Sequence, residues 1–128
     1  MDVRLLNGNI ARLNLAGRKR RTQPEESKSR LQHDIGVWLA AKYPCDQIYE
    51  EVRVPREGFV LDFFIPSLRI VVECNGRQHD EFVPYFHGTR QNFVRQQLRD
   101  RRKADWCARN GFSLVKYSEK DIHNGKSE

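Results

Sequence analysis

The segment FVLDFFI, residues 59–65, constrains the fold more than any other part of the chain. Successive side chains of a β-strand point to opposite faces, so Val60, Asp62 and Phe64 are expected on one face and the other four side chains opposite. Because both faces are apolar, the segment predicts a central strand covered on both sides. Helices are then needed on both faces of a sheet.

The other elements are predicted from periodicity and turn signals. A first helix is expected over 22–43, where Thr22 and Glu25 fit a capping box and apolar residues recur at helical spacing. Further strands are expected at 47–54, 68–76 and 112–119, and a second helix at 91–109, ended by Asn110-Gly111. The predicted order is α-β-β-β-α-β, an α/β fold with a mixed central sheet flanked by helices.

Length and composition predict one domain with a polyanionic partner. Within 128 residues we expect a flexible basic arm at 1–21, a domain at 22–119 and a polar tail at 120–128. Lys and Arg number 23 against 17 acids, and a net charge of +6 favours nucleic acid as the partner. No apolar run is long enough to predict a membrane span.

Cysteine usage favours a reducing compartment. Cys45, Cys74 and Cys107 are odd in number and match no zinc spacing. They are therefore expected to be reduced thiols of a cytoplasmic protein. A Cys/His zinc protein stays open as a minor alternative.

Three acids occupy positions where the pattern calls for apolar side chains. Asp62 interrupts one hydrophobic strand and Glu73 ends another. Asp100 falls on a helical stripe that is expected to face inward and that also contains Phe93, Gln97, Ala104 and Cys107. A buried carboxylate is costly unless it is paired, neutralised or metal-bound.

A shared cation is one explanation for Asp62 and Glu73. Two carboxylates about 4 Å apart repel by roughly 4 kcal/mol at an effective dielectric near 20, and a divalent cation reverses that sign. Few hard oxygen ligands, with room for water and a phosphate oxygen, describe a Mg²⁺ site. The alternative pairs Asp62 with an arginine and turns Glu73 to solvent.

His79 follows Glu73 by six residues, across the Asn75-Gly76 break. A neutral imidazole can accept a proton from water, and Asp100 could orient that ring or hold a water. The alternative for His79 is a polar surface residue.

The segments LDFFI, RIVVECNGRQH and RDRRKADWCARNGFSLVKYSE resemble the PD-(D/E)xK restriction-endonuclease-like superfamily. They are most similar to its very-short-patch repair endonuclease branch, which also includes phage homing endonucleases. The resemblance implies that Asp62 binds Mg²⁺ and that the backbone carbonyl near Cys74 is a second ligand. It also implies that His79 acts as or assists the general base and that Asp100 completes the site.

The chain departs from the family pattern at three points. The superfamily lysine falls at Asn75, which carries no charge, so water activation passes to His79. The branch's first-helix glutamate aligns with Gln32, a weaker metal ligand that could orient a water. The structural zinc ligands of the repair endonuclease are not matched.

The expected function is therefore a Mg²⁺-dependent DNA endonuclease, with Mn²⁺ as a possible substitute. Asp62 and Glu73 hold the ion, and His79 removes a proton from the attacking water. Contacts to the phosphates of double-stranded DNA are expected from the basic side chains of Lys19, Arg21, Arg77, Arg99, Arg101 and Arg102.

The resemblance implies that the protein acts in a bacterial or phage-infected cell. The sequence leaves open whether the protein is a monomer or a homodimer. The main alternative function is a DNA-binding module that keeps the fold and lacks the chemistry.

Overall fold

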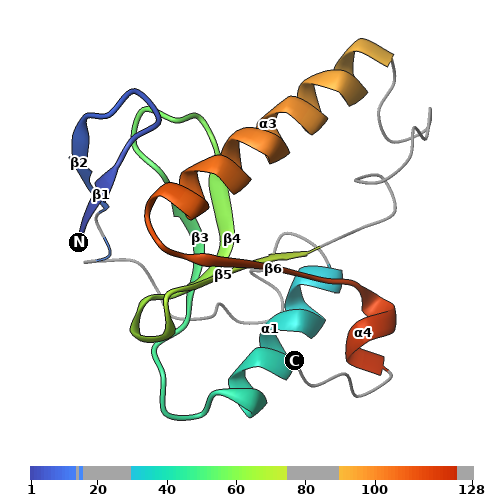
Figure 1. The fold of residues 1–128 in the computed structure, drawn as a ribbon. Coiled ribbons are helices and arrows are strands. Elements are labelled where there is room, and N and C mark those ends of the chain that lie inside the picture. Colours follow the sequence, from blue (N-terminus) through green and yellow to red (C-terminus); the bar gives the residue numbers. More distant parts are fainter. Residues whose placement is uncertain (14, 16–29, 75–89, 124–128) are drawn as a thin grey trace.

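The computed structural model describes residues 1–13, 15, 30–74 and 90–123. Within these residues it contains a two-stranded hairpin, a four-stranded mixed sheet, a 3-10 turn and three α-helices (Figure 1). The elements are β1 (Asp2–Arg4), β2 (Ile10–Arg12), α1 (Arg30–Lys42), β3 (Tyr49–Arg53), β4 (Val60–Ile65), η2 (Pro66–Leu68), β5 (Ile70–Cys74), α3 (Arg90–Arg109), β6 (Ser113–Tyr117) and α4 (Glu119–His123). No helix in this part of the chain is long and apolar enough to cross a membrane.

The main sheet has the strand order β3-β4-β5-β6. β4 runs antiparallel to both β3 and β5, whereas β5 and β6 are parallel and are joined through α3. A parallel pair requires such a crossover because the chain must return to the end of the sheet at which the first strand began. The predicted order α-β-β-β-α-β and the mixed α/β class are confirmed, with a hairpin added before them and a short helix after them.

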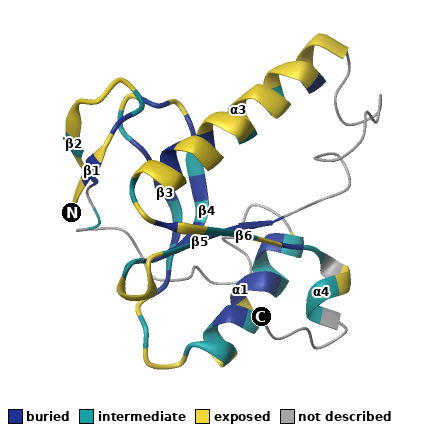
Figure 2. Ribbon diagram, in the orientation of Figure 1, coloured by how far each residue is buried: buried dark blue, intermediate teal, exposed yellow. Residues whose placement is uncertain are grey.

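Two hydrophobic cores lie on the two faces of this sheet, as the apolar character of both faces of β4 predicted. The hairpin-side core joins the sheet to the β1-β2 hairpin and α3, and it contains Val3, Leu5, Leu13, Val52, Val54, Phe59, Leu61, Phe64, Val71, Trp106, Cys107 and Phe112. The α1-side core joins the sheet to α1, and it contains Ile35, Leu39, Ile48, Phe63, Ile65, Val72, Cys74 and Tyr117. Figure 2 shows buried positions on both α1 and α3.

The prediction of a flexible arm beginning at residue 1 is wrong for residues 1–13, which form the N-terminal hairpin. Val3, Leu5 and Leu13 are at most 2% exposed, so residues 1–13 are part of the folded unit. These apolar residues alternate with other residues on either side of an Asn-Gly pair. Such a pattern is a strong hairpin signal, and the sequence interpretation overlooked it. Residues 16–21 lie outside the described part of the chain.

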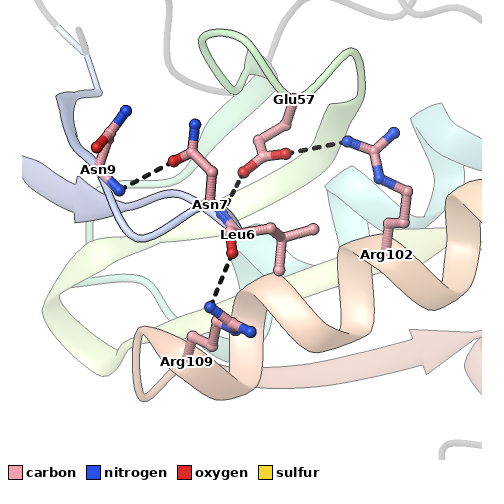
Figure 3. Close-up of polar contacts among 6 residues, drawn as sticks. All are labelled: Leu6, Asn7, Asn9, Glu57, Arg102 and Arg109. Atoms are coloured by element: carbon pink, nitrogen blue, oxygen red, sulfur yellow. Dashed lines mark hydrogen bonds and ion pairs between the residues drawn. The ribbon is translucent and has the colours of Figure 1, made fainter.

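The tip of this hairpin is held by charged side chains from the β3-β4 turn and from α3 (Figure 3). The backbone N–H of Leu6 donates to Glu57 Oε2 at 2.7 Å, and its carbonyl accepts from Arg109 at 2.9 Å. Arg102 of α3 donates to the other oxygen of Glu57 at 3.1 Å. Glu57 is only 5% exposed, and the guanidinium group of Arg102 balances the charge of this buried carboxylate.

The C-terminal end of α3 follows the predicted cap. The helix ends at Arg109, and Gly111 has a φ of 71°, the left-handed conformation that glycine adopts most readily. The side chain of Asn110 turns to the hairpin, where it accepts from the N–H of Arg4 at 2.7 Å and donates to the carbonyl of Arg4 at 2.9 Å. The cap thus also anchors β1.

The predicted boundary between domain and tail at residues 119 and 120 is wrong, because helix α4 crosses it. Ser118 precedes the helix, and its backbone N–H donates to Asp121 Oδ2 at 2.8 Å. Asp121 in turn donates its N–H to Ser118 Oγ at 3.3 Å, which completes a capping box. Ile122 packs against the α1-side core, so residues 120–123 belong to the folded unit.

Candidate functional site

The expected alternation of β4 changes at Asp62. Phe59 and Leu61 belong to the hairpin-side core, whereas Phe63 and Ile65 belong to the α1-side core. The prediction that these four side chains share one face is therefore wrong. A regular strand cannot make this change, so the backbone is irregular where Asp62 lies.

Glu51 of β3 lies opposite this irregularity. The pairs on either side of it are Glu50 with Phe63 and Val52 with Leu61. Glu51 has a φ of 59°, a left-handed conformation that costs a residue with a side chain about 1 kcal/mol or more. Strain of this kind occurs often at functional sites.

Strands β4 and β5 part beyond Phe63 and Val72, the last residues paired between them. β4 remains paired with β3 as far as Val60, and β5 remains paired with β6 as far as Cys74. Residues 60–62 and 73–74 therefore form the two sides of an opening, which we call the β4-β5 fork. Polar side chains rather than backbone pairs fill it.

Asp62 and Glu73 connect the two sides of the fork. The backbone N–H of Asp62 donates to Glu73 Oε2 at 3.1 Å, and the N–H of Cys74 donates to Asp62 Oδ2 at 2.9 Å. Each carboxylate thus binds the opposite strand. The structure brings these two predicted site residues together, and Glu73 is 8% exposed rather than turned to solvent.

Lys103 of α3 completes the fork, and the sequence interpretation did not identify it. Its ammonium group donates to Glu73 Oε1 at 2.6 Å and to the carbonyl of Val60 at 2.8 Å. The residue is 7% exposed. Its sequence signal is indirect, because Lys103 is three residues from both Asp100 and the buried Trp106 and so shares their side of the helix.

The buried stripe of α3 matches the prediction only in part. Phe93 and Cys107 are buried as expected, but Gln97 and Ala104 are exposed. Lys103 and Trp106 are buried instead, because Lys103 meets the charge of Glu73 and Trp106 fills the hairpin-side core. Asp100 is half-buried one turn before Lys103.

Burial and charge make Glu73 a weak acid. Burial and the neighbouring Asp62 raise its pKa to about 7, and the ammonium of Lys103 limits that increase. Burial, with Asp62, Glu73 and Glu50 nearby, also raises the pKa of the Cys74 thiol, which stays protonated. The fork therefore concentrates negative charge in a poorly hydrated place.

Gln32 lies on the α1 side of the sheet and is 3% exposed. Its amide group donates to Glu50 Oε2 at 2.6 Å and to Glu51 Oε2 at 2.9 Å. These two glutamates were not predicted as site residues. Glu50 also helps to raise the pKa of the Cys74 thiol at the end of β5.

The candidate metal ligands in this part of the chain are a few oxygen donors. No group of three or more His, Cys, Asp or Glu side chains is placed to hold an ion among the residues described. The pair Asp62 and Glu73 matches Mg²⁺, which is often bound by one or two carboxylates together with water and substrate phosphate. Cys45 is exposed, and Cys74 and Cys107 are buried in different cores.

The predicted arginines of α3 divide into two kinds. Arg102 is paired with the buried Glu57 and so helps to hold the hairpin. Arg99 and Arg101 are exposed, but residues two apart in an α-helix point about 200° apart. One flat surface therefore cannot contact both of them.

Several predicted site residues lie outside the described part of the chain, and their roles remain predictions. They are the proposed general base and its neighbours in sequence and the two basic residues of the N-terminal arm: His79, Asn75, Arg77, Lys19 and Arg21.

No family model matches the chain, and no solved structure matches it significantly. Three iridovirus proteins, each described only as uncharacterized, are similar to it. Protein 094L of Frog virus 3 (isolate Goorha) is 42% identical over 112 residues, 78% of this chain and 68% of that protein. Protein 307L of Invertebrate iridescent virus 6 is 41% identical over 64 residues, 48% of this chain and 32% of that protein.

Protein 033L of Invertebrate iridescent virus 3 is 38% identical over 55 residues, 43% of this chain and 28% of that protein. The chain thus spans about a third or less of two of these relatives. All three are proteins of iridoviruses, whereas the resemblance implied a bacterial or phage-infected cell.

Proposed function

The chain belongs to the same family as protein 094L of Frog virus 3, and we propose that it is a metal-dependent DNA endonuclease with a restriction-endonuclease-like core. The element order α-β-β-β-α-β and the mixed sheet support this proposal, because they match the order implied by the motif resemblance. The reaction proposed is hydrolysis of phosphodiester bonds in double-stranded DNA.

The β4-β5 fork carries the proposal. Two carboxylates from neighbouring antiparallel strands meet where the ladder between the strands has ended, beside a buried ammonium group. Apolar residues would fill such an opening without the penalty of burying charge. A cluster of buried charges with a strongly perturbed pKa is typical of a functional site.

The carboxylates of Asp62 and Glu73 and the backbone carbonyl of Cys74 are the proposed ligands of Mg²⁺ or Mn²⁺. They are hard oxygen donors, and their small number leaves room for water and a phosphate oxygen. When bound, such an ion lowers the pKa of a coordinated water and neutralises charge on the phosphate.

The remaining roles follow the motif resemblance. His79 is proposed to accept the proton of the attacking water on its imidazole ring, with Asp100 orienting that ring or a water. Gln32 is proposed to act through the acidic groups that it binds rather than as a ligand. Phosphate contacts are proposed for five basic side chains, those of Lys19, Arg21, Arg77 and the exposed Arg99 and Arg101.

The second candidate is a DNA-binding module without catalysis. One observation favours it: the charge of Glu73 is already balanced by Lys103 without any added ion. Binding and cleavage therefore have to be measured separately.

The test is nicking of a supercoiled plasmid with Mg²⁺ or Mn²⁺. We expect Asp62→Asn to lower the nicking rate about 100-fold or more, because the variant keeps the shape of the side chain and loses its charge. The matched control is Asp105→Asn, which removes an exposed acid of α3 and should nick like the parent.

A mobility-shift measurement with the same DNA separates the two candidates. Binding without cleavage in any divalent ion supports the inactive module. Equal nicking by the parent and Asp62→Asn shows that the fork is not the active site.

A further inference from the structure

Lys103 is a buried cation that contacts one of the two proposed metal ligands. Its ammonium group lies 2.6 Å from Glu73 Oε1 and 2.8 Å from the carbonyl of Val60, and its nitrogen is 5.8 Å from the centre of the Phe59 ring. An ammonium group has three N–H donors. Only two of them have acceptors among the residues that the structure describes.

The contacts of Glu73 leave neither of its oxygens without a donor. Oε1 accepts from Lys103, and Oε2 accepts from the backbone N–H of Asp62. A divalent cation that binds Glu73 must therefore approach a positive charge already in contact with the same carboxylate. Two cations at one buried carboxylate repel each other, so the ammonium group opposes the binding of the metal.

DNA offers the ammonium group another partner. Lys103 belongs to α3, which also carries the exposed Arg99 about one turn before it on the same side of the helix. A phosphate held near Arg99 brings anionic oxygens toward the fork. Hydrogen bonds from an ammonium group to a phosphate are charge-assisted, as are those to a carboxylate.

We propose that Lys103 is an internal competitor for the cation at Glu73, and that a DNA phosphate releases Glu73 by taking over the ammonium group. This inference rests on the proposed function for the identity of the two ligands. It implies that metal and DNA bind cooperatively. By linkage, each ligand must raise the affinity for the other by the same factor.

A purely structural ion pair leads to the opposite expectation. If Lys103 only held the fork together, its removal would loosen Asp62 and Glu73 and weaken the binding of a cation. If Lys103 competes with the cation, its removal strengthens that binding. The sign of the change in affinity therefore distinguishes the two roles.

The experiment is calorimetric titration of the full chain with Ca²⁺, with and without a short DNA duplex. Ca²⁺ is a hard cation that also prefers oxygen ligands. The titrations are made at about pH 9, above the raised pKa of Glu73. For the parent we expect DNA to strengthen Ca²⁺ binding about tenfold, a usual size for coupled sites.

Lys103→Met keeps the apolar stem and removes the charge. We expect this variant to bind Ca²⁺ without DNA about tenfold more tightly than the parent, and to lose most of the gain from DNA. Lys103→Arg keeps a cation at Glu73 and should behave like the parent. Lys116→Met is the matched control, because Lys116 is exposed on β6 directly beside Glu73.

Unchanged or weaker Ca²⁺ binding by a folded Lys103→Met variant overturns the inference. If that variant does not fold, Lys103→Gln and the effect of DNA on the parent decide instead, and equal Ca²⁺ affinity with and without DNA contradicts the inference. Cleavage is not part of this measurement. A parent that never nicks DNA therefore defeats the proposed function and leaves the competition at Glu73 to be judged by affinity.

Discussion

Folding alters the protonation of Glu73 in the range around neutral pH. Its carboxyl group is buried beside Asp62, and its pKa rises from an ordinary value of 4.5 to about 7. The folded chain therefore holds the proton more tightly than the unfolded chain between these two values. The stability that this provides is complete below pH 4.5 and is lost as the pH rises through about 7.

The first stability prediction follows from this sign. Between about pH 5 and pH 8 the parent should lose up to about 3 kcal/mol more unfolding free energy than Glu73→Gln, which cannot ionise. Urea denaturation at several pH values measures both curves. Parallel curves would show that Glu73 ionises normally in the folded protein.

The residues that sequence alone could identify were those that broke a pattern. Asp62 and Glu73 interrupt apolar strands, and the structure brings them together. Lys103 broke no pattern, because a lysine in an arginine-rich helix is ordinarily solvated. Its role depends on the packing of α3 against the fork, which no local periodicity encodes.

At the scale of elements, the β1-β2 hairpin is held to the rest of the protein by single polar contacts. Glu57 joins the N–H of Leu6 to Arg102 of α3, and it is buried. A buried charged acceptor shared by two donors is worth more than an exposed pair, because its loss leaves those donors without a partner.

Glu57→Ala is therefore expected to destabilise the protein by about 2 kcal/mol and to speed amide exchange at Leu6. Asp2→Ala is the control, because Asp2 forms an exposed pair with Arg12 in the same hairpin and should cost under about 0.5 kcal/mol. Urea denaturation and hydrogen exchange measure these effects. Equal losses in the two variants would contradict the role of Glu57.

Sequence patterns predicted the long elements well and the short ones poorly. The stripe of Ile35 and Leu39 in α1 and the glycine cap of α3 were confirmed. The hairpin and α4 were missed because each has only three to five residues per element, too few to show a period. Their turn and cap signals were present, but each needed tertiary contacts to be stable.

The whole molecule is built as one sheet between two cores, and residues 1–13 complete one of them. Val3, Leu5 and Leu13 are buried there. Burial of three such side chains contributes roughly 5–9 kcal/mol, which is comparable to the total stability of a domain. The hairpin is therefore part of the minimal folded unit.

We expect a chain lacking residues 1–13 to show no cooperative thermal transition by circular dichroism. The control is the double variant Val94→Ala/Leu98→Ala, which removes apolar side chains that are about half exposed on α3. It should melt within a few degrees of the parent. A cooperative transition near the parent's temperature in the shortened chain would show that the hairpin is dispensable.

The early end of the β4-β5 ladder has a mechanical consequence. The sheet consists of two ribbons, β3 with β4 and β5 with β6, whose backbone ladder to each other has three residue pairs within the described part of the chain. This seam is a natural pivot, and the acidic groups lie beyond its last pair. A small rotation of one ribbon against the other about this seam therefore displaces these groups more than any residue along the seam, because displacement grows with distance from the axis of rotation.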